Sequence, residues 1–206
     1  NWPADSPEAD GVADGKSYEK FRADHLKRAP TLYVAANDGM LHAFDATIAT
    51  TPADSVDVTP NPGAERWAYV PYSAYERLRG WSSLTDFSFM PSVDGTPVSR
   101  DVYFDEGDSV GWHTILVGGL RLGGRGVYAL DINEAASTEG STSGKTMGPA
   151  LRVLWEFNHT SDGGANLAYT FGRPNIGRLA NGKWVVLVPG GYFPEGSTDN
   201  AAKNTF

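Results

Sequence analysis

Short runs of apolar and aromatic residues alternate with turn-forming residues along most of the chain. From Thr31 onward these runs are rich in Val, Leu, Tyr, Trp and Phe, and Gly, Pro and Asn-Asp-Gly separate them. This pattern is typical of antiparallel β-structure. Because Asp38-Gly39 tolerates the positive φ angles of a tight turn, a hairpin is predicted over 31–36 and 40–45. Further strands are predicted at 65–71, 87–93, 97–104, 112–120, 126–132, 151–158, 176–179 and 184–188.

Helical signals are few and short. Apolar and aromatic residues at helical spacing follow Ser17, which can cap a helix, so a short helix is predicted over 17–28, ending before Pro30. A single helical turn is predicted at 73–78. Residues 1–16 are polar and acidic and are interpreted as a loop.

Internal repetition is the most informative feature of the sequence. The string Trp-His-Thr-Ile-Leu-Val-Gly-Gly matches Trp-Val-Val-Leu-Val-Pro-Gly-Gly at an offset of 72 residues, a strand-ending Asp recurs after 86, and a strand Trp recurs after 88. The order within each unit is constant: a Pro-led strand, an apolar strand ending in small residues, a strand ending in Asp, and a strand carrying Trp. The positions that mark this repeat are Asp45, Trp67, Trp112, Gly118, Gly119, Asp131, Trp155, Trp184, Gly190 and Gly191.

Four short strands per unit is the description of a propeller blade. The predicted fold is therefore all-β: about two and a half antiparallel blades of a larger, quinoprotein-like propeller, preceded by a short N-terminal helix. Residues 1–30 form an acidic lead-in, and 31–206 form the partial propeller. Within it, 31–93 is an incomplete blade with an insertion, 94–158 a complete blade, and 159–206 the start of the next. The Ser/Thr/Gly-rich residues 133–149 are predicted to form an excursion at a blade tip.

The repeated side chains have expected structural roles. Each blade has two apolar faces and needs a neighbour on both. The Trp residues are expected to fill the space between blades, with the indole N–H bonded to a carbonyl. The strand-ending Asp is expected to cap the following turn by accepting backbone N–H bonds.

Composition excludes several classes of protein and of site. The 206 residues carry 25 acidic and 17 basic side chains, a net charge of -8, without a Lys/Arg-rich run, which argues against nucleic acid as a partner. With no Cys there is no disulfide or thiolate metal site. No apolar run approaches the length of a membrane span. Any targeting signal is expected to lie upstream of residue 1.

The sequence offers no catalytic or cofactor-binding constellation. The Gly-rich run 118–126 lacks the Lys and Ser/Thr of a phosphate-binding loop, the four histidines are isolated, and no Gly-x-Ser-x-Gly elbow occurs. We therefore predict a protein that is not an enzyme. Metal binding is left undecided, because the acidic clusters match the spacing of a calcium loop poorly. The candidate ligands are Asp5, Glu8, Asp10, Asp14, Asp105 and Asp108.

Several long strings carry a resemblance to a known family. They lie at 32–46 (Leu-Tyr-Val-Ala-Ala-Asn-Asp-Gly-Met-Leu-His-Ala-Phe-Asp-Ala), 114–132, 153–157 and 169–174. In content and order they resemble the C-terminal propeller of PilY-type proteins, the type IV pilus tip-associated adhesins and assembly factors related to the neisserial pilus-associated PilC adhesins. The resemblance covers about 31–192, or 162 of the 206 residues.

The resemblance implies a non-enzymatic module of a secreted bacterial protein that acts at the pilus tip, outside the cell. It implies roles in fimbrium biogenesis, the balance of pilus assembly and retraction, twitching motility and cell adhesion. The implied partners are the remaining propeller blades, the N-terminal half of the parent chain, minor pilins, and a host or abiotic surface. No cofactor is expected in this segment, and calcium binding elsewhere in the parent is left open. Two alternatives stay open: a ligand- or glycan-binding propeller without a pilus role, and a fragment of a quinoprotein dehydrogenase.

Overall fold

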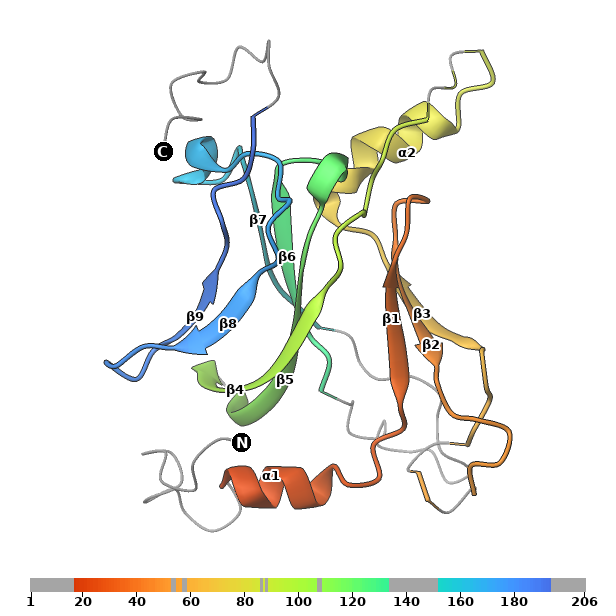
Figure 1. The fold of residues 1–206 in the computed structure, drawn as a ribbon, viewed down its shortest axis with the longest axis vertical. Coiled ribbons are helices and arrows are strands. Elements are labelled where there is room, and N and C mark those ends of the chain that lie inside the picture. The colour runs from red at the N-terminus through yellow and green to blue at the C-terminus, as the bar shows by residue number, and fades with distance from the viewer. Residues whose placement is uncertain are drawn as a thin grey trace.

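Three twisted antiparallel sheets stand side by side in the computed structural model (Figure 1). The first sheet has the order β1-β2-β3, the second β4-β5-β6-β7, and the third β8-β9. The structure describes residues 17–52, 55–56, 59–85, 87, 89–106, 109–133 and 152–193. The strands are β1 (Thr31–Ala35), β2 (Leu41–Asp45), β3 (Glu65–Tyr69), β4 (Val98–Glu106), β5 (Ser109–Gly119), β6 (Gly126–Asp131), β7 (Arg152–Asn158), β8 (Asn175–Arg178) and β9 (Trp184–Leu187). The prediction of antiparallel propeller blades is confirmed, and the four-stranded second sheet matches a complete blade.

Helical segments are short and lie at the ends of the sheets (Figure 1). They are α1 (Tyr18–Asp24), α2 (Tyr75–Trp81) and the 3-10 turns η1 (Tyr72–Ala74), η2 (Arg121–Gly123) and η3 (Gly164–Asn166). The Ser17 side chain caps α1 by accepting a 3.1 Å hydrogen bond from the backbone N–H of Lys20, as predicted. The predicted turn at 73–78 is realised as η1 followed by α2.

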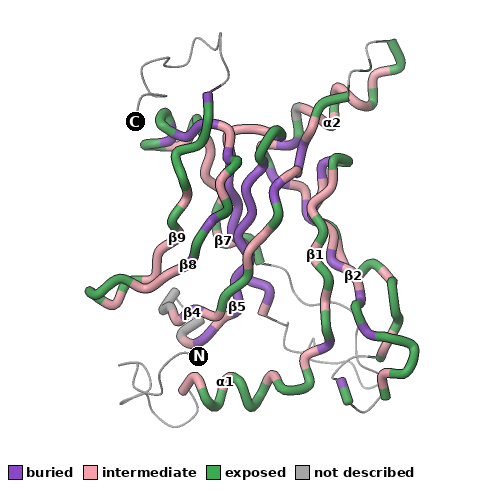
Figure 2. Tube along the Cα trace, viewed as in Figure 1, coloured by how far each residue is buried: buried purple, intermediate pink, exposed green. Residues whose placement is uncertain are grey.

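The second sheet lies between the other two sheets, and both of its faces are buried (Figure 2). Its side chains alternate between the faces: Leu116 and Tyr128 contribute to the core shared with the first sheet, and Val117 and Val127 to the core shared with the third. On the first side, Leu41 and Tyr69 meet them from β2 and β3. On the second side, Ile176 of β8 is fully buried, and Trp184 and Val186 of β9 pack around it. The apolar contacts therefore lie between sheets, as a propeller requires.

The sequence repeat corresponds to a repeated irregularity in strand pairing. In the first sheet Ala43 pairs with Trp67, and in the second Ala129 pairs with Trp155. Directly after each alanine the register shifts, between Ala43 and Phe44 and between Ala129 and Leu130. The alanines are 86 residues apart and the tryptophans 88. The two offsets differ because the stretch from the paired alanine to the paired tryptophan is two residues longer in the second sheet.

One predicted strand is wrong. None of the described residues in 87–93 belongs to a strand, and β4 pairs only with β5. Pro91 lacks a ladder donor, the Pro91 carbonyl accepts a 3.0 Å bond from Arg77, and Val93 is fully buried in the core between the first two sheets. The aromatic residues that suggested a strand, Phe87 and Phe89, are exposed.

Helix α1 closes the lower end of the second sheet (Figure 1). The Tyr18 ring lies 4.5 Å from that of Trp112, and the Tyr18 hydroxyl donates a 3.0 Å bond to Asp101 of β4. Beyond the helix, Arg28 donates to the Thr114 hydroxyl at 2.7 Å and to Asn133 at 2.8 Å. The described part of the lead-in, residues 17–30, is therefore tied to the second sheet, although it precedes the first sheet in sequence.

Candidate functional site

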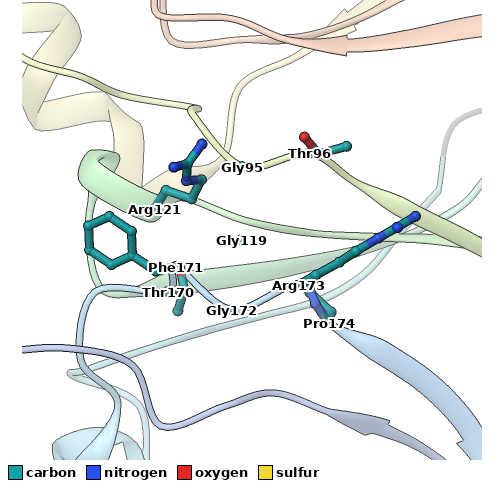
Figure 3. A pocket seen from close by; sticks show the side chains of 9 residues that line it. All are labelled: Gly95, Thr96, Gly119, Arg121, Thr170, Phe171, Gly172, Arg173 and Pro174. Atoms are coloured by element: carbon teal, nitrogen blue, oxygen red, sulfur yellow. The ribbon is translucent and has the colours of Figure 1, made fainter.

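A pocket formed by described residues lies between the second and third sheets (Figure 3). Its volume is about 280 Å³, and it forms where the segment before β4 meets the segment before β8. Figure 3 shows Arg121 and Phe171 on one side of the pocket and Arg173 on the other. The lining residues are Gly95, Thr96, Gly119, Arg121, Thr170, Phe171, Gly172, Arg173 and Pro174.

Closely packed backbone forms the floor of this pocket. A Cβ on Gly95 would lie 2.1 Å from the Gly119 carbonyl oxygen, so only glycine permits this approach. The Thr170 hydroxyl accepts a 2.8 Å bond from the Leu120 N–H and donates a 2.9 Å bond to the Gly126 carbonyl. Thr170 is buried, so these bonds fix the start of the 170–174 segment against the second sheet.

Arg121 is held over the pocket in an unusual backbone conformation. Its φ angle is 48°, and among the described residues it is the one non-glycine residue with positive φ. Left-handed backbone at a non-glycine residue costs free energy and occurs often at functional sites. The Arg121 guanidinium lies 5.8 Å from the centre of the Phe171 ring, a cation-π geometry, and 3.9 Å from a carboxylate oxygen of Asp94.

A second hollow of about 460 Å³ continues from the first and shares Arg173 and Pro174 with it. Arg100 lines this part and donates a 2.7 Å bond to the Ile176 carbonyl. The two hollows together place three guanidinium groups along one groove, and neither described lining contains an Asp or Glu. The local charge is therefore positive in a chain whose net charge is -8.

A third hollow, of about 610 Å³, lies between the first two sheets, where η1 and α2 meet the end of β7. Tyr72 and Tyr75 line it with their rings 5.6 Å apart. Its arginines have structural partners: Arg77 bonds to the Pro91 carbonyl, and Arg125 bonds to the Leu167 carbonyl at 2.8 Å. Among the described residues, the arginine side chains of this hollow are therefore hydrogen-bonded to backbone carbonyl groups, unlike those of Arg121 and Arg173 in the first pocket.

The first strand-ending Asp organises a turn, as predicted. Asp45 is buried and accepts bonds from the Thr47 N–H at 2.8 Å and the Asn61 N–H at 3.0 Å, and Arg66 lies 3.2 Å away. Burial alone raises the pKa of a carboxyl group, but here the bonds to Thr47, Asn61 and Arg66 outweigh it and lower the pKa of Asp45 to about 2. The carboxylate is therefore charged, and its bonds to Thr47, Asn61 and Arg66 hold the 46–64 connection in place.

Asp131 repeats the arrangement in the second sheet. It accepts a 2.9 Å bond from the Asn133 N–H, which stands 86 residues after Thr47 as Asp131 does after Asp45. Its other oxygen contacts the His113 Nδ1 at 2.8 Å, and Arg152 lies 3.6 Å away. The His113–Asp131 pair therefore belongs to the turn that Asp131 caps.

An inter-sheet bond involves Glu156, which sequence reasoning did not single out. The Tyr69 hydroxyl of β3 donates to Glu156 of β7, and both Glu156 oxygens accept from the Tyr72 N–H, at 3.0 and 2.9 Å. Burial, together with this bond, raises the pKa of Tyr69. The residues are 87 apart in sequence, so no local pattern could have paired them.

Comparison with known proteins assigns these sheets to a family. The family described as the PilY1 beta-propeller domain matches residues 8–205. This chain belongs to that family. Among PilY1 relatives, the type IV pilus biogenesis factor PilY1 of Pseudomonas aeruginosa (strain UCBPP-PA14) is 32% identical over 189 residues, which cover 89% of this chain and 13% of the relative. A PilY1 homolog from Xylella fastidiosa (strain Temecula1 / ATCC 700964) is 33% identical over 185 residues, which cover 90% of this chain and 12% of the relative.

A solved structure agrees with the PilY1 assignment. The crystal structure of the Pseudomonas aeruginosa PilY1 C-terminal domain superposes with a TM-score of 0.58 at 33% identity, and the match covers 91% of this chain and 30% of that one. The resemblance stated from the sequence and the propeller fold are both confirmed. The chain spans about an eighth of the length of the curated PilY1 relatives it matches.

The repeated tryptophans of this PilY1-family chain do not share one environment. Trp112 is buried, and its ring lies 6.0 Å from that of Trp184, so this pair fills the space between the second and third sheets. Trp67 packs against the core between the first two sheets, with its ring 5.7 Å from that of Tyr33. Trp155 is 39% exposed on β7. The expected indole N–H bond to a carbonyl is wrong for Trp67 and Trp112, whose buried Nε1 atoms have no hydrogen-bond partner among the described residues.

The paired glycines of the repeat also differ between sheets. Gly118 and Gly119 lie within β5, where they pair with Tyr128 and Val127. Gly190 and Gly191 lie beyond the end of β9, and the Gly190 carbonyl accepts a 2.8 Å bond from the Ala168 N–H. The two similar strings therefore both form a strand, β5 and β9, but their glycine pairs have different structural positions.

The candidate metal ligands are for the most part outside the described residues. Asp5, Glu8, Asp10, Asp14 and Asp108 fall there, as does the excursion predicted at 133–149 apart from Asn133. The backbone of Asp105 lies in β4, opposite Val110. Within the described ranges, no three His, Asp or Glu side chains gather closely enough to hold a metal ion, and no helix is long and apolar enough to cross a membrane.

Proposed function

We propose that this chain is a non-enzymatic module of a type IV pilus tip-associated protein. In this proposal the module is needed for the balance between pilus assembly and retraction, for twitching motility and for surface adhesion. The observation that carries the proposal is the family match over residues 8–205, together with relatives named type IV pilus biogenesis factor PilY1. The proposed location is the pilus tip, outside the cell.

The use of the buried polar groups supports a structural role. Asp45 and Asp131 hold turns, and Glu156 ties the first sheet to the second. Each of these carboxylates is engaged by backbone N–H groups or by a neighbouring sheet, which favours rigidity over chemistry. The proposed partners are the remaining blades and N-terminal half of a parent chain, minor pilins, and a host or abiotic surface.

The proposal is tested in the source organism by deleting the codons for 94–158 in frame and measuring surface pili. Sheared pilin and total cellular pilin are quantified by immunoblot, and twitching zones are measured. We expect sheared pilin and twitching to be lost while total pilin is unchanged. Repeating the deletion in a strain unable to retract pili separates a failure to assemble from excess retraction.

The control is Arg79→Ala, which alters an exposed side chain of α2. Immunoblots of the parent protein establish that the deletion variant accumulates. Normal piliation and twitching in a deletion strain that accumulates the shortened protein would contradict the proposal.

A further inference from the structure

We propose that the arginine groove between the second and third sheets binds the carboxylate side chains of an acidic peptide segment from a partner protein. The groove consists of the two connected hollows that Arg121, Arg173 and Arg100 line. This inference does not depend on the pilus role, because purified protein tests it directly.

Charge is the first argument. The chain has eight more acidic than basic side chains, yet the described lining of the groove holds three arginines and no Asp or Glu. A carboxylate oxygen of Asp94 lies 3.9 Å from Arg121, which is longer than a charge-assisted hydrogen bond. Arg173 is exposed, and among the described residues no ion pair or hydrogen bond engages its side chain. At Arg121 and Arg173 the groove therefore offers guanidinium groups that have donors to spare.

Preorganisation is the second argument. The positive φ of Arg121 and its position over Phe171 hold one guanidinium at the pocket rim (Figure 3). Thr170 and the close approach of Gly95 to Gly119 fix the backbone beneath it. A strained residue on a rigid floor, with its cation directed over an aromatic ring, is expected where the side chain must meet a ligand.

Completeness is the third argument. The walls of the groove come from the start of β4, from η2 and from the 170–176 segment, all of this chain. Further blades would add to the free faces of the first and third sheets, whereas this groove lies between two sheets already in contact. Described residues of this chain therefore form both walls of the groove.

The lining also selects among anionic partners. Arginines donate but do not accept. Of the two threonine hydroxyls in the 280 Å³ hollow, that of Thr170 is already bonded to Leu120 and Gly126, so the hollow suits a carboxylate better than a neutral sugar with many hydroxyl groups. A long polyanion would be repelled by a chain of net charge -8. A short segment with one or two carboxylates is attracted by the arginines of the groove. It carries too little charge to be strongly repelled by the rest of the chain.

The test is a binding titration on the purified parent protein. The probe is a fluorescein-labelled peptide of alternating glutamate and glycine, compared with the same peptide carrying glutamine, and binding is followed by fluorescence anisotropy. We expect saturable binding of the glutamate peptide that weakens with added salt, and at least about tenfold weaker binding of the glutamine peptide.

Variants locate the site. Arg173→Ala should weaken glutamate-peptide binding about tenfold, and Arg173→Lys should weaken it less, because lysine keeps the charge but loses the planar pair of donors. Arg79→Ala removes another exposed arginine, one outside the groove, and should leave binding unchanged. Arg173 makes no described contact that the fold requires, and circular dichroism of the variants checks that they are folded.

Each contrary result overturns the proposal. These results are no saturable binding, equal affinity for the glutamate and glutamine peptides, equal affinity in Arg173→Ala and wild type, and displacement of the peptide by sialyllactose at lower concentrations than by unlabelled peptide. The last result would assign the groove to an acidic sugar. None of them bears on the piliation of the deletion strain, so the two proposals fail separately.

Discussion

The Tyr69 hydroxyl donates a hydrogen bond to a Glu156 carboxylate oxygen and thereby joins the first sheet to the second. Because Tyr69 is buried, Tyr69→Phe removes a charge-assisted bond that water does not replace. We expect the free energy of opening of the 69–75 amides to fall by about 2 kcal/mol. Hydrogen exchange with mass spectrometry on the parent protein measures this.

The matched control for that bond is Tyr192→Phe, since Tyr192 is exposed. Glu156→Gln keeps an acceptor for Tyr69 and removes the charge, so its effect should lie between those of Tyr69→Phe and the control. Unchanged exchange at 69–75 in Tyr69→Phe would show that the bond does not stabilise the junction.

The two sheet-borne tryptophans Trp112 and Trp155 should respond differently to truncation. Trp112 is buried against Tyr18, Tyr103 and Trp184, so Trp112→Ala should cost about 4 kcal/mol in the free energy of opening of β5. Trp155 is 39% exposed, and Trp155→Ala should cost less than half as much. The urea dependence of hydrogen exchange in β5 measures both, and equal losses would contradict the assigned environments.

Acid should weaken the 46–64 connection through Asp45. Its pKa is about 2 in the folded chain against the ordinary value of 3.8, so its contribution to stability is present above pH 3.8 and is lost as the pH falls toward 2. Asp45→Asn should therefore be less stable than wild type at neutral pH, and the difference should shrink across that acidic window. Thermal melting at several pH values measures it. Asp162→Asn, at an exposed position, is the control, and a constant difference between Asp45→Asn and wild type across the window would refute the assignment.

The hairpin of β1 and β2 should be weaker at alkaline pH. Partial burial opposes charging of His42, but its bonds to Glu65 and Asp38, both 2.8 Å, outweigh burial and raise its pKa. A raised folded pKa means that the contribution is complete below the unfolded value of 6.5 and is lost as pH rises through the folded pKa. Hydrogen exchange at 31–45, corrected for intrinsic rates, should show this loss in wild type and not in His42→Gln. Identical pH profiles would contradict it.

Features set by neighbouring residues were predictable from the sequence. The Ser17 cap, the turn at Gly39 and the turn-capping role of Asp45 and Asp131 depend on contacts within a few residues, apart from the Asn61 bond to Asp45. The repeat of these local features was sufficient to predict the blades. The boundaries assigned to the blades remain predictions.

Features set by contacts between sheets were not predictable in the same way. The aromatic run 87–93 was interpreted as a strand because exposed Phe87 and Phe89 have the same sequence signal as buried ones. The positive φ of Arg121, within the Gly-rich run 118–126, had no sequence signal. Its proximity to Phe171 depends on the packing of the third sheet on the second.

The central claim is that this chain functions at the type IV pilus, and the most direct test is mass spectrometry of sheared, purified pili from the source organism. A strain lacking the major pilin, processed identically, provides the background. We predict that peptides from 94–158 co-purify with pilin and are absent from the pilin-deficient preparation. Their recovery in equal amounts from both strains, or only in cellular fractions, would contradict the claim.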